Sequence, residues 1–138
     1  MKKKTIFVSV FAILIFALTL FIYSFFIIYK DVKAACLKAQ NEYQEDFVSS
    51  LIKYIQEDKH TFRARNSAVW ALGQLADKKA LPFLYELDNS LPAQEKCSYN
   101  EYLCKYEVEK AIRWCEQGNI TNWMYQKRSS WYSKLPVE

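Results

Sequence analysis

The 138-residue chain contains only two glycines, three prolines and one histidine. Two glycines cannot build a glycine-rich phosphate-binding loop, and they leave few turn residues for a sheet of many short strands. A single histidine leaves little material for a histidine-based metal site or a catalytic triad. That histidine, His60, lies in the expected turn Glu57–Phe62, where we expect a solvated side chain. We therefore predict no enzyme, and no catalytic, cofactor-binding or metal-binding residues.

An excess of positive charge is missing from most of the chain. The formal net charge is +4, and Lys2, Lys3, Lys4 and Lys30 account for all of it. After Lys30 the acidic and basic side chains balance. A basic surface for nucleic acid is therefore not expected, since such a surface needs clustered lysine and arginine.

What the chain does contain is a long apolar segment near its N-terminus. The residues from Ile6 to Tyr29 read IFVSVFAILIFALTLFIYSFFIIY, with no charge, proline or glycine among 24 positions. An α-helix of this length extends about 36 Å, which is enough to cross a bilayer. We predict a basic tail at residues 1–5 and a transmembrane signal anchor at residues 6–29, with the lipid bilayer as the partner of residues 6–29.

Two other fates of this segment remain open. The first is a cleaved signal peptide, because MKKK forms a basic start and Val32-Lys33-Ala34 offers small residues before a cut; the apolar run is longer than usual for such a peptide and favours an uncleaved anchor. The second is a lipoprotein, in which a signal peptidase cuts before Cys36 and this cysteine then carries lipid. The segment before Cys36 resembles the lipoprotein motif, but Lys33 stands where that motif needs leucine.

The orientation of the anchor follows from the charges on its two sides. Residues 2–4 supply three lysines before it, and Lys30, Lys33 and Lys38 follow it, so the comparison of positive charge is nearly a tie. A short tri-lysine tail is poorly suited to translocation. We therefore predict a single-pass membrane protein with a cytoplasmic N-terminus and an extracytoplasmic C-terminal domain.

The remainder of the chain predicts helices only. Residues 30–44 lack glycine and proline and are predicted as a helical stalk, with the first helix of the domain as the alternative. Apolar stripes at helical spacing predict helices at about 47–55, 61–75 and 78–87. Asp77 is expected to cap the third of these, and Pro82 lies near its first turn. A last helix ends before Gly118 and starts near either Ser98 or Tyr106.

The four cysteines lack the C-x-x-C spacing of a zinc site. On one continuous helix Cys104 and Cys115 would be about 16 Å apart, beyond the roughly 5.5 Å between Cα atoms that a disulfide needs. Either the last helix starts late and Cys97 or Cys104 folds back toward a partner, or Cys104 and Cys115 are buried thiols. Cys97 with Cys104 is the first predicted pairing, and it requires a loop at residues 98–103.

Aromatic residues supply the candidates for partner contact. Trp70 stands among polar neighbours on its predicted helix, so it either lies under an adjacent helix or contacts a partner. Residues 119–138 contain too many aromatic side chains for a free terminus, and we predict that they fold back as a cap over the last open helix face. Trp70 and Trp131 are the predicted contact residues.

The most patterned segment reads RNSAVWALGQLADKKALPFLYELD, residues 65–88. It resembles the short HEAT-like repeat of the phycobilisome-lyase type, whose copies read roughly R-x-x-A-x-x-A-L-G-x-L-x-D followed by A-L-P-x-L. The matching positions are Arg65, Ala68, Ala71, Leu72, Gly73, Asp77, Pro82 and Asp88. The resemblance implies antiparallel helix pairs with small residues at the contact. It also implies that Asp58, Arg65 and Asp88 tie successive units together.

With weaker copies on both sides, the resemblance implies an α-solenoid of HEAT-like helix pairs at residues 45–118. Such a domain behind a membrane anchor predicts a scaffold for protein–protein interaction or assembly, with a protein partner at or near the membrane. Two alternatives remain: an accessory subunit held mainly through its transmembrane helix, and an enzyme related to bilin-attaching lyases, with which only the scaffold pattern is shared. No small-molecule substrate is identified.

Overall fold

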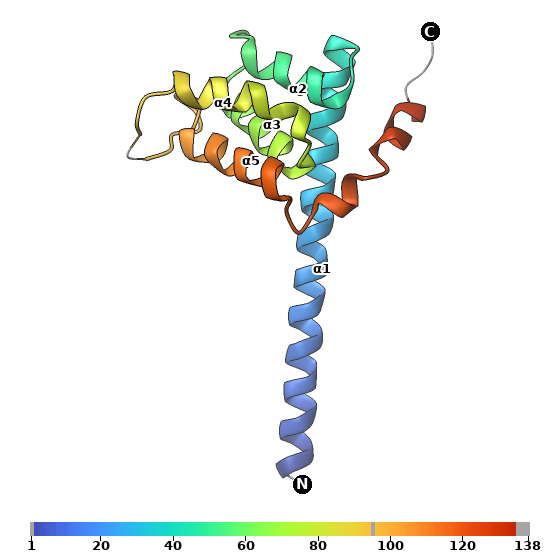
Figure 1. Ribbon diagram of the computed structural model, residues 1–138. Coiled ribbons are helices and arrows are strands. Elements are labelled where there is room, and N and C mark those ends of the chain that lie inside the picture. Colours follow the sequence, from blue (N-terminus) through green and yellow to red (C-terminus); the bar gives the residue numbers. More distant parts are fainter. Residues whose placement is uncertain (1, 95, 135–138) are drawn as a thin grey trace. The chain divides into compact units, whose positions relative to one another are not determined.

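The computed structural model describes residues 2–94 and 96–134 (Figure 1). This part of the chain forms helices and loops without a strand, so the all-α prediction is confirmed. Met1 of the predicted basic tail and residues 135–138 of the predicted cap lie outside it. In order, the elements are α1 (Lys2–Tyr43), α2 (Phe47–Gln56), α3 (Phe62–Leu75), η1 (Lys78–Ala80), α4 (Leu81–Ser90), α5 (Lys105–Gln117), η2 (Asn122–Tyr125) and η3 (Arg128–Lys134).

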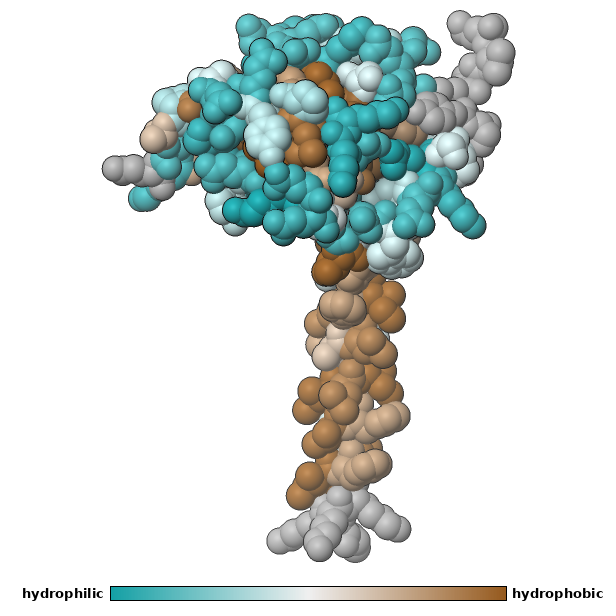
Figure 2. All heavy atoms as spheres, viewed as in Figure 1, coloured by the Kyte–Doolittle hydropathy of each residue, from teal (hydrophilic) through white to brown (hydrophobic). Residues whose placement is uncertain are grey.

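The chain divides into an N-terminal unit, residues 1–31, and a C-terminal unit, residues 32–138. The N-terminal unit consists of the first part of α1, whose apolar side chains are visible in Figure 2. Its most apolar 18-residue window has a mean hydropathy of 2.8, and none of that window is buried. Length and composition allow this helix to cross a membrane, and they are shared by signal sequences.

The last three turns of α1 belong to the core of the C-terminal unit. Val32, Cys36 and Ala39 lie four and three residues apart, so they share one face of the helix, and at most 1% of each is exposed. The predicted stalk at residues 30–44 therefore does not describe residues 32–43. The alternative, a first helix of the domain, does. The stalk was predicted from composition, and composition alone does not show that Val32, Cys36 and Ala39 form a buried stripe.

This burial makes Val32→Ala a destabilising substitution. The change removes two methyl groups from a fully buried side chain, and we expect it to lower the free energy of unfolding of the C-terminal unit by about 1–3 kcal/mol. The exposed Ala34, changed to Ser, is the matched control. Thermal unfolding of both variants in detergent, followed by circular dichroism, measures the difference. Equal unfolding of Val32→Ala and the control would show that this turn is not part of the core.

Local capping sets the ends of the middle helices. Asp46 accepts hydrogen bonds from the first backbone N–H groups of α2, and Thr61 does the same for α3. Asp77 caps η1 by accepting from the Lys79 N–H at 3.0 Å. The helix predicted at about 78–87 is therefore divided: η1 comes first, and α4 follows with Pro82 in its first turn and continues to Ser90.

Helix α3 lies at the centre of the C-terminal unit, packed against α2 on one side and α5 on the other, and α5 also packs against α4. Ala68, Ala71 and Leu72 are buried at these contacts. A Cβ atom added to Gly73 would lie 2.9 Å from the Ala111 Cα. The backbones of α3 and α5 therefore approach closely at Gly73. Glycine is needed at this position for space, since the backbone there is not left-handed.

The C-terminal tail returns to the same unit, but to its first elements. Tyr125 is fully buried, and Trp131 is 4% exposed with its ring edge-on to Phe47 of α2 at 5.4 Å. The Arg128 guanidinium pairs with Asp77. The described part of the tail thus packs on α2, on the end of α3 and on the start of η1. The prediction of Trp131 as a partner contact is wrong, because this side chain is part of the core.

Candidate functional site

The residues expected to tie repeat units together act as structural groups. Arg65, 9% exposed, donates from Nε to the Ile55 carbonyl at 2.6 Å and from Nη1 to Asp58 Oδ1 at 2.8 Å. It therefore joins α3 to the end of α2. Asp88 does not take part in this link: it pairs with Lys105, whose Nζ lies 3.2 Å from Asp88 Oδ1, and thereby joins α4 to α5.

His60 lies in a cluster of charged and aromatic groups. Its side chain is 12% exposed and its ring stacks on Tyr54 at 3.6 Å, so the expectation of a solvated histidine is wrong. Ligand atoms of Glu42, Glu57 and His60 lie within 4.8 Å of one another. The Lys59 ammonium, however, lies 2.6 Å from an oxygen of each glutamate and forms an ion pair with both. The cluster is an ion-pair link between α1 and the α2–α3 turn.

The loop between α4 and α5 is closed by a disulfide. Cys97 and Cys104 are joined, with their Cα atoms 5.3 Å apart. Helix α5 begins only at Lys105, so residues 98–103 are loop, as this pairing requires, and of the two predicted helix starts the later one applies. Cys104 is the N-cap residue of α5, which fixes the end of the loop to the start of the helix.

One side chain of α3, Asn66, fastens this loop to the helix core. Asn66 is 2% exposed. Its Nδ2 donates to the carbonyl of Tyr102 at 2.8 Å and to that of Tyr99 at 3.2 Å, and its Oδ1 accepts from the Cys104 N–H at 2.8 Å. An asparagine side chain has two N–H donors and two acceptor lone pairs, so it can make at most four hydrogen bonds. Asn66 makes three of them with the loop. The loop is therefore held at both ends and in its middle.

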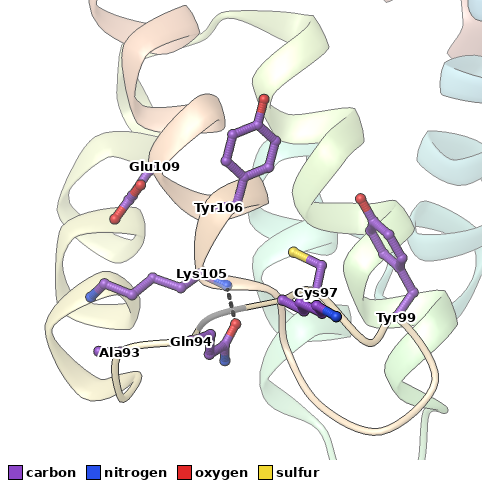
Figure 3. Close-up of a pocket in the computed structure, with 8 residues that line it drawn as sticks. Ala93, Gln94, Cys97, Tyr99, Lys105, Tyr106 and Glu109 are labelled. Atoms are coloured by element: carbon purple, nitrogen blue, oxygen red, sulfur yellow. Dashed lines mark hydrogen bonds between the residues drawn. The ribbon is translucent and has the colours of Figure 1, made fainter.

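The loop, α3 and α5 together form a concave surface around Tyr99, which we call the Tyr99 surface. Its members are Arg63, Ser67, Trp70, Tyr99, Asn100, Tyr106, Glu109 and Lys110. Tyr99 lines three adjoining hollows, the largest of about 490 Å³. In Figure 3 the rings of Tyr99 and Tyr106 rise beside Cys97 from the loop and from α5. Tyr99 is 46% and Tyr106 57% exposed.

A buried carboxylate supports the Tyr99 surface from beneath. Glu107 is 6% exposed and accepts from the Tyr99 hydroxyl at 3.0 Å. The Lys110 ammonium lies 2.8 Å from Glu107 Oε2 and 5.0 Å from the centre of the Trp114 ring. Burial, followed by the hydrogen bond to Glu107, raises the pKa of Tyr99, so its hydroxyl remains a donor at neutral pH. The hydrogen bond to Glu107 therefore holds the exposed ring in place.

The sequence predicted only part of this surface. Trp70 lines it and is half-buried. This exposure lies between the two predictions for Trp70, burial under an adjacent helix and full exposure as a contact residue. Asn66, Tyr99, Tyr106 and Glu107 were missed. Asn66 had one detectable signal: it lies three and seven residues before the buried Val69 and Gly73, so a polar side chain interrupts an otherwise apolar face.

The two cysteines outside the disulfide, Cys36 and Cys115, give a testable prediction. Both are buried, and burial raises the pKa of each thiol to about 12. Because the thiolate is the reactive form, neither should be alkylated at pH 7.5 in the folded protein. Unfolding without reductant should expose two thiols, and unfolding with reductant four. Mass spectrometry after alkylation counts them; four reactive thiols without reductant would contradict the disulfide.

No family model matches the chain, and no curated protein or solved structure is significantly similar to it. The likeness to HEAT-like repeats therefore remains a prediction from residues 65–88. The functional argument rests on the geometry of the chain itself.

Proposed function

We propose that this chain is a single-pass membrane protein whose C-terminal unit binds a protein partner through the Tyr99 surface. The observation that carries this proposal is the exposure of Tyr99 and Tyr106 on a backbone held by a disulfide and by Asn66. Tyrosine and tryptophan are enriched in protein interfaces, since they bury a large area at a low cost in side-chain entropy.

Membrane anchoring is supported by the burial of the turn that follows the apolar segment. A signal peptidase cut after Ala34 would remove Val32, which is fully buried, and Lys33, whose ammonium lies 5.6 Å from the centre of the Trp131 ring. Cleavage there would therefore take contacts out of the folded unit. Retention of the segment as an anchor keeps them.

A short HEAT-like solenoid is the arrangement we propose for the helices. Helices α2 and α3 pack together as one pair and α4 and α5 as a second, and α3 packs against α5. Gly73 and the buried alanines at these contacts support this arrangement, because they let helix backbones approach. In solenoids the stacked pairs present a continuous surface for partners.

The anchor would make a modest docking surface sufficient. Confinement to a membrane raises the effective concentration of the C-terminal unit near other membrane proteins, so affinity through a few aromatic residues is enough. The polar rim of the surface, with Arg63 on one side and Glu109 on the other, offers both signs of charge to a partner. We therefore expect a protein partner rather than a small apolar ligand.

The test compares two double variants of the full-length protein. Trp70→Ala with Tyr99→Ala removes two rings of the surface, and Phe62→Ala with Tyr85→Ala removes two exposed rings elsewhere. Proteins cross-linked to each in native membranes are quantified by mass spectrometry. We expect the first variant to recover the partner at least about tenfold less than wild type, the cost of losing one interface hot spot, and the control to recover it normally.

Two results would contradict the proposal. Equal recovery by both variants would show that the Tyr99 surface takes no part in binding. Loss of the partner only when residues 6–29 are replaced by an unrelated apolar helix would favour the accessory subunit instead. Circular dichroism of the variants shows whether a loss comes from unfolding.

A further inference from the structure

The two most exposed large apolar side chains among the described residues of the C-terminal unit lie outside the Tyr99 surface. Ile120 is 76% and Trp123 is 62% exposed, more than any other large apolar side chain among the described residues of this unit. Ile120 lies in the segment that joins α5 to η2 (Asn122–Tyr125), and Trp123 lies in η2 itself. Leaving two such groups in water is unfavourable, so their exposure calls for an apolar or amphipathic partner.

The backbone that carries them is fixed. Asn119 donates from Nδ2 to the carbonyls of Gly73 and Gln74 at 3.0 and 3.2 Å, and its Oδ1 accepts from the Thr121 N–H at 2.8 Å. The Thr121 hydroxyl also hydrogen-bonds to Gln74. Ile120 and Trp123 are therefore presented by a turn that is bound to the end of α3.

Contacts within the unit place this turn near the residues that follow the apolar segment. The rings of Tyr125 and Trp131 lie 6.4 Å apart, and the Lys33 ammonium lies 5.6 Å from the centre of the Trp131 ring. Lys33 follows Tyr29 by four residues, and four residues of chain can span at most about 14 Å. Within the C-terminal unit, the η2 segment thus lies in the same region as Lys33, which is four residues along the chain from the end of the apolar run.

The chemistry of the turn suits the surface of a bilayer. Tryptophan is enriched where membranes meet water, because its ring is apolar and its N–H can reach a polar group. Lys127 is exposed two residues after Tyr125, and Lys33 lies in the same region, whereas the Arg128 guanidinium is paired with Asp77. Positive side chains there are attracted to anionic lipid headgroups.

We propose that Ile120 and Trp123 insert into the interfacial layer of the membrane that holds the apolar helix. The bilayer is then bound twice: by residues 6–29 across its thickness and by this pair at its surface. The second contact limits the rotation of the C-terminal unit and so fixes the direction in which its other surfaces face. This inference rests on the proposed membrane anchor, but it concerns a different surface from Tyr99 and is independent of the protein partner.

The test uses full-length protein in vesicles of phosphatidylcholine and phosphatidylglycerol. Ile120→Cys, labelled with an environment-sensitive fluorophore, reports on the turn, and Glu86→Cys on the exposed part of α4 is the matched control. Selective labelling is feasible because Cys36 and Cys115 are buried and the other two cysteines form the disulfide. Brominated lipids quench a fluorophore that enters the bilayer, and aqueous iodide quenches one that does not.

We expect brominated lipids to quench the label at position 120 and not at position 86, with iodide showing the reverse. Because a fluorophore is itself apolar and can enter the bilayer on its own, unlabelled protein provides a second measurement. Brominated lipids should quench part of the tryptophan emission of the wild type. The Trp123→Ser variant should lack this quenched part. Iodide quenching at both positions would overturn the proposal. Protection from iodide at position 120 without quenching by brominated lipids would also overturn it, since it would indicate a protein contact there.

Discussion

Gly73→Val is expected to lower the free energy of unfolding of the C-terminal unit by about 3 kcal/mol or more. The added Cβ would lie 2.9 Å from the Ala111 Cα and 3.0 Å from the Trp114 Cε3, closer than carbon atoms approach without strain. The first of these atoms belongs to backbone and cannot move by a change of rotamer. To relieve the contact, α3 and α5 must separate, which also opens the packing around Leu72.

A graded series checks this cause. Gly73→Ala introduces only the Cβ and should cost less than Gly73→Val, whereas Ala76→Gly should be neutral or stabilising, since Ala76 has a φ of 50° that glycine adopts more readily. Chemical unfolding of the three variants in detergent gives the three free energies. A Gly73→Val variant as stable as wild type would show that α3 and α5 do not meet at this residue.

Asn66→Ala is expected to cost about 2–4 kcal/mol, because it leaves the Cys104 N–H and the carbonyls of Tyr99 and Tyr102 without their partner. The effect should concentrate in the loop, since the disulfide keeps its two ends together while its middle is released. Hydrogen exchange of the Cys104 amide should therefore accelerate more than that of the α2 amides.

The matched control for Asn66 is Asn100→Ala, which changes an exposed asparagine in the same loop and should alter stability by less than about 0.5 kcal/mol. The Asn66 variant should also weaken partner binding, because Tyr99 loses its fixed position. Unchanged exchange at Cys104 in Asn66→Ala would mean that the disulfide alone holds the loop.

The sequence predicted the elements whose signals are local. The apolar stripes of α2 and α3, the cap at Asp77 and the end of α5 at Gly118 all depend on neighbours within a few residues, and the structure has them. The distance along a helix, which is also a local argument, disfavoured a Cys104–Cys115 disulfide; Cys97 with Cys104 was the first of the pairings left open, and the structure has it.

The rest depends on packing between distant segments. Asp88 pairs with Lys105 because α4 lies against α5, which no local pattern encodes. The aromatic residues of the tail indicated burial, but whether Trp131 covers α5 or Phe47 is a question of tertiary structure. Tyr99 becomes part of a surface only because Asn66 holds its loop to α3, 33 residues earlier in the chain.

The central claim, that the Tyr99 surface binds a protein partner at the membrane, is tested most directly by site-specific photocross-linking in native membranes. A photoreactive residue is placed at the exposed Asn100 in the surface, at the exposed Tyr85 outside it, and at Phe16 in the apolar helix. The account predicts a discrete protein adduct from position 100 that Trp70→Ala abolishes, and none from position 85. Adducts from position 16 alone would contradict it and would place the partner contact within the membrane.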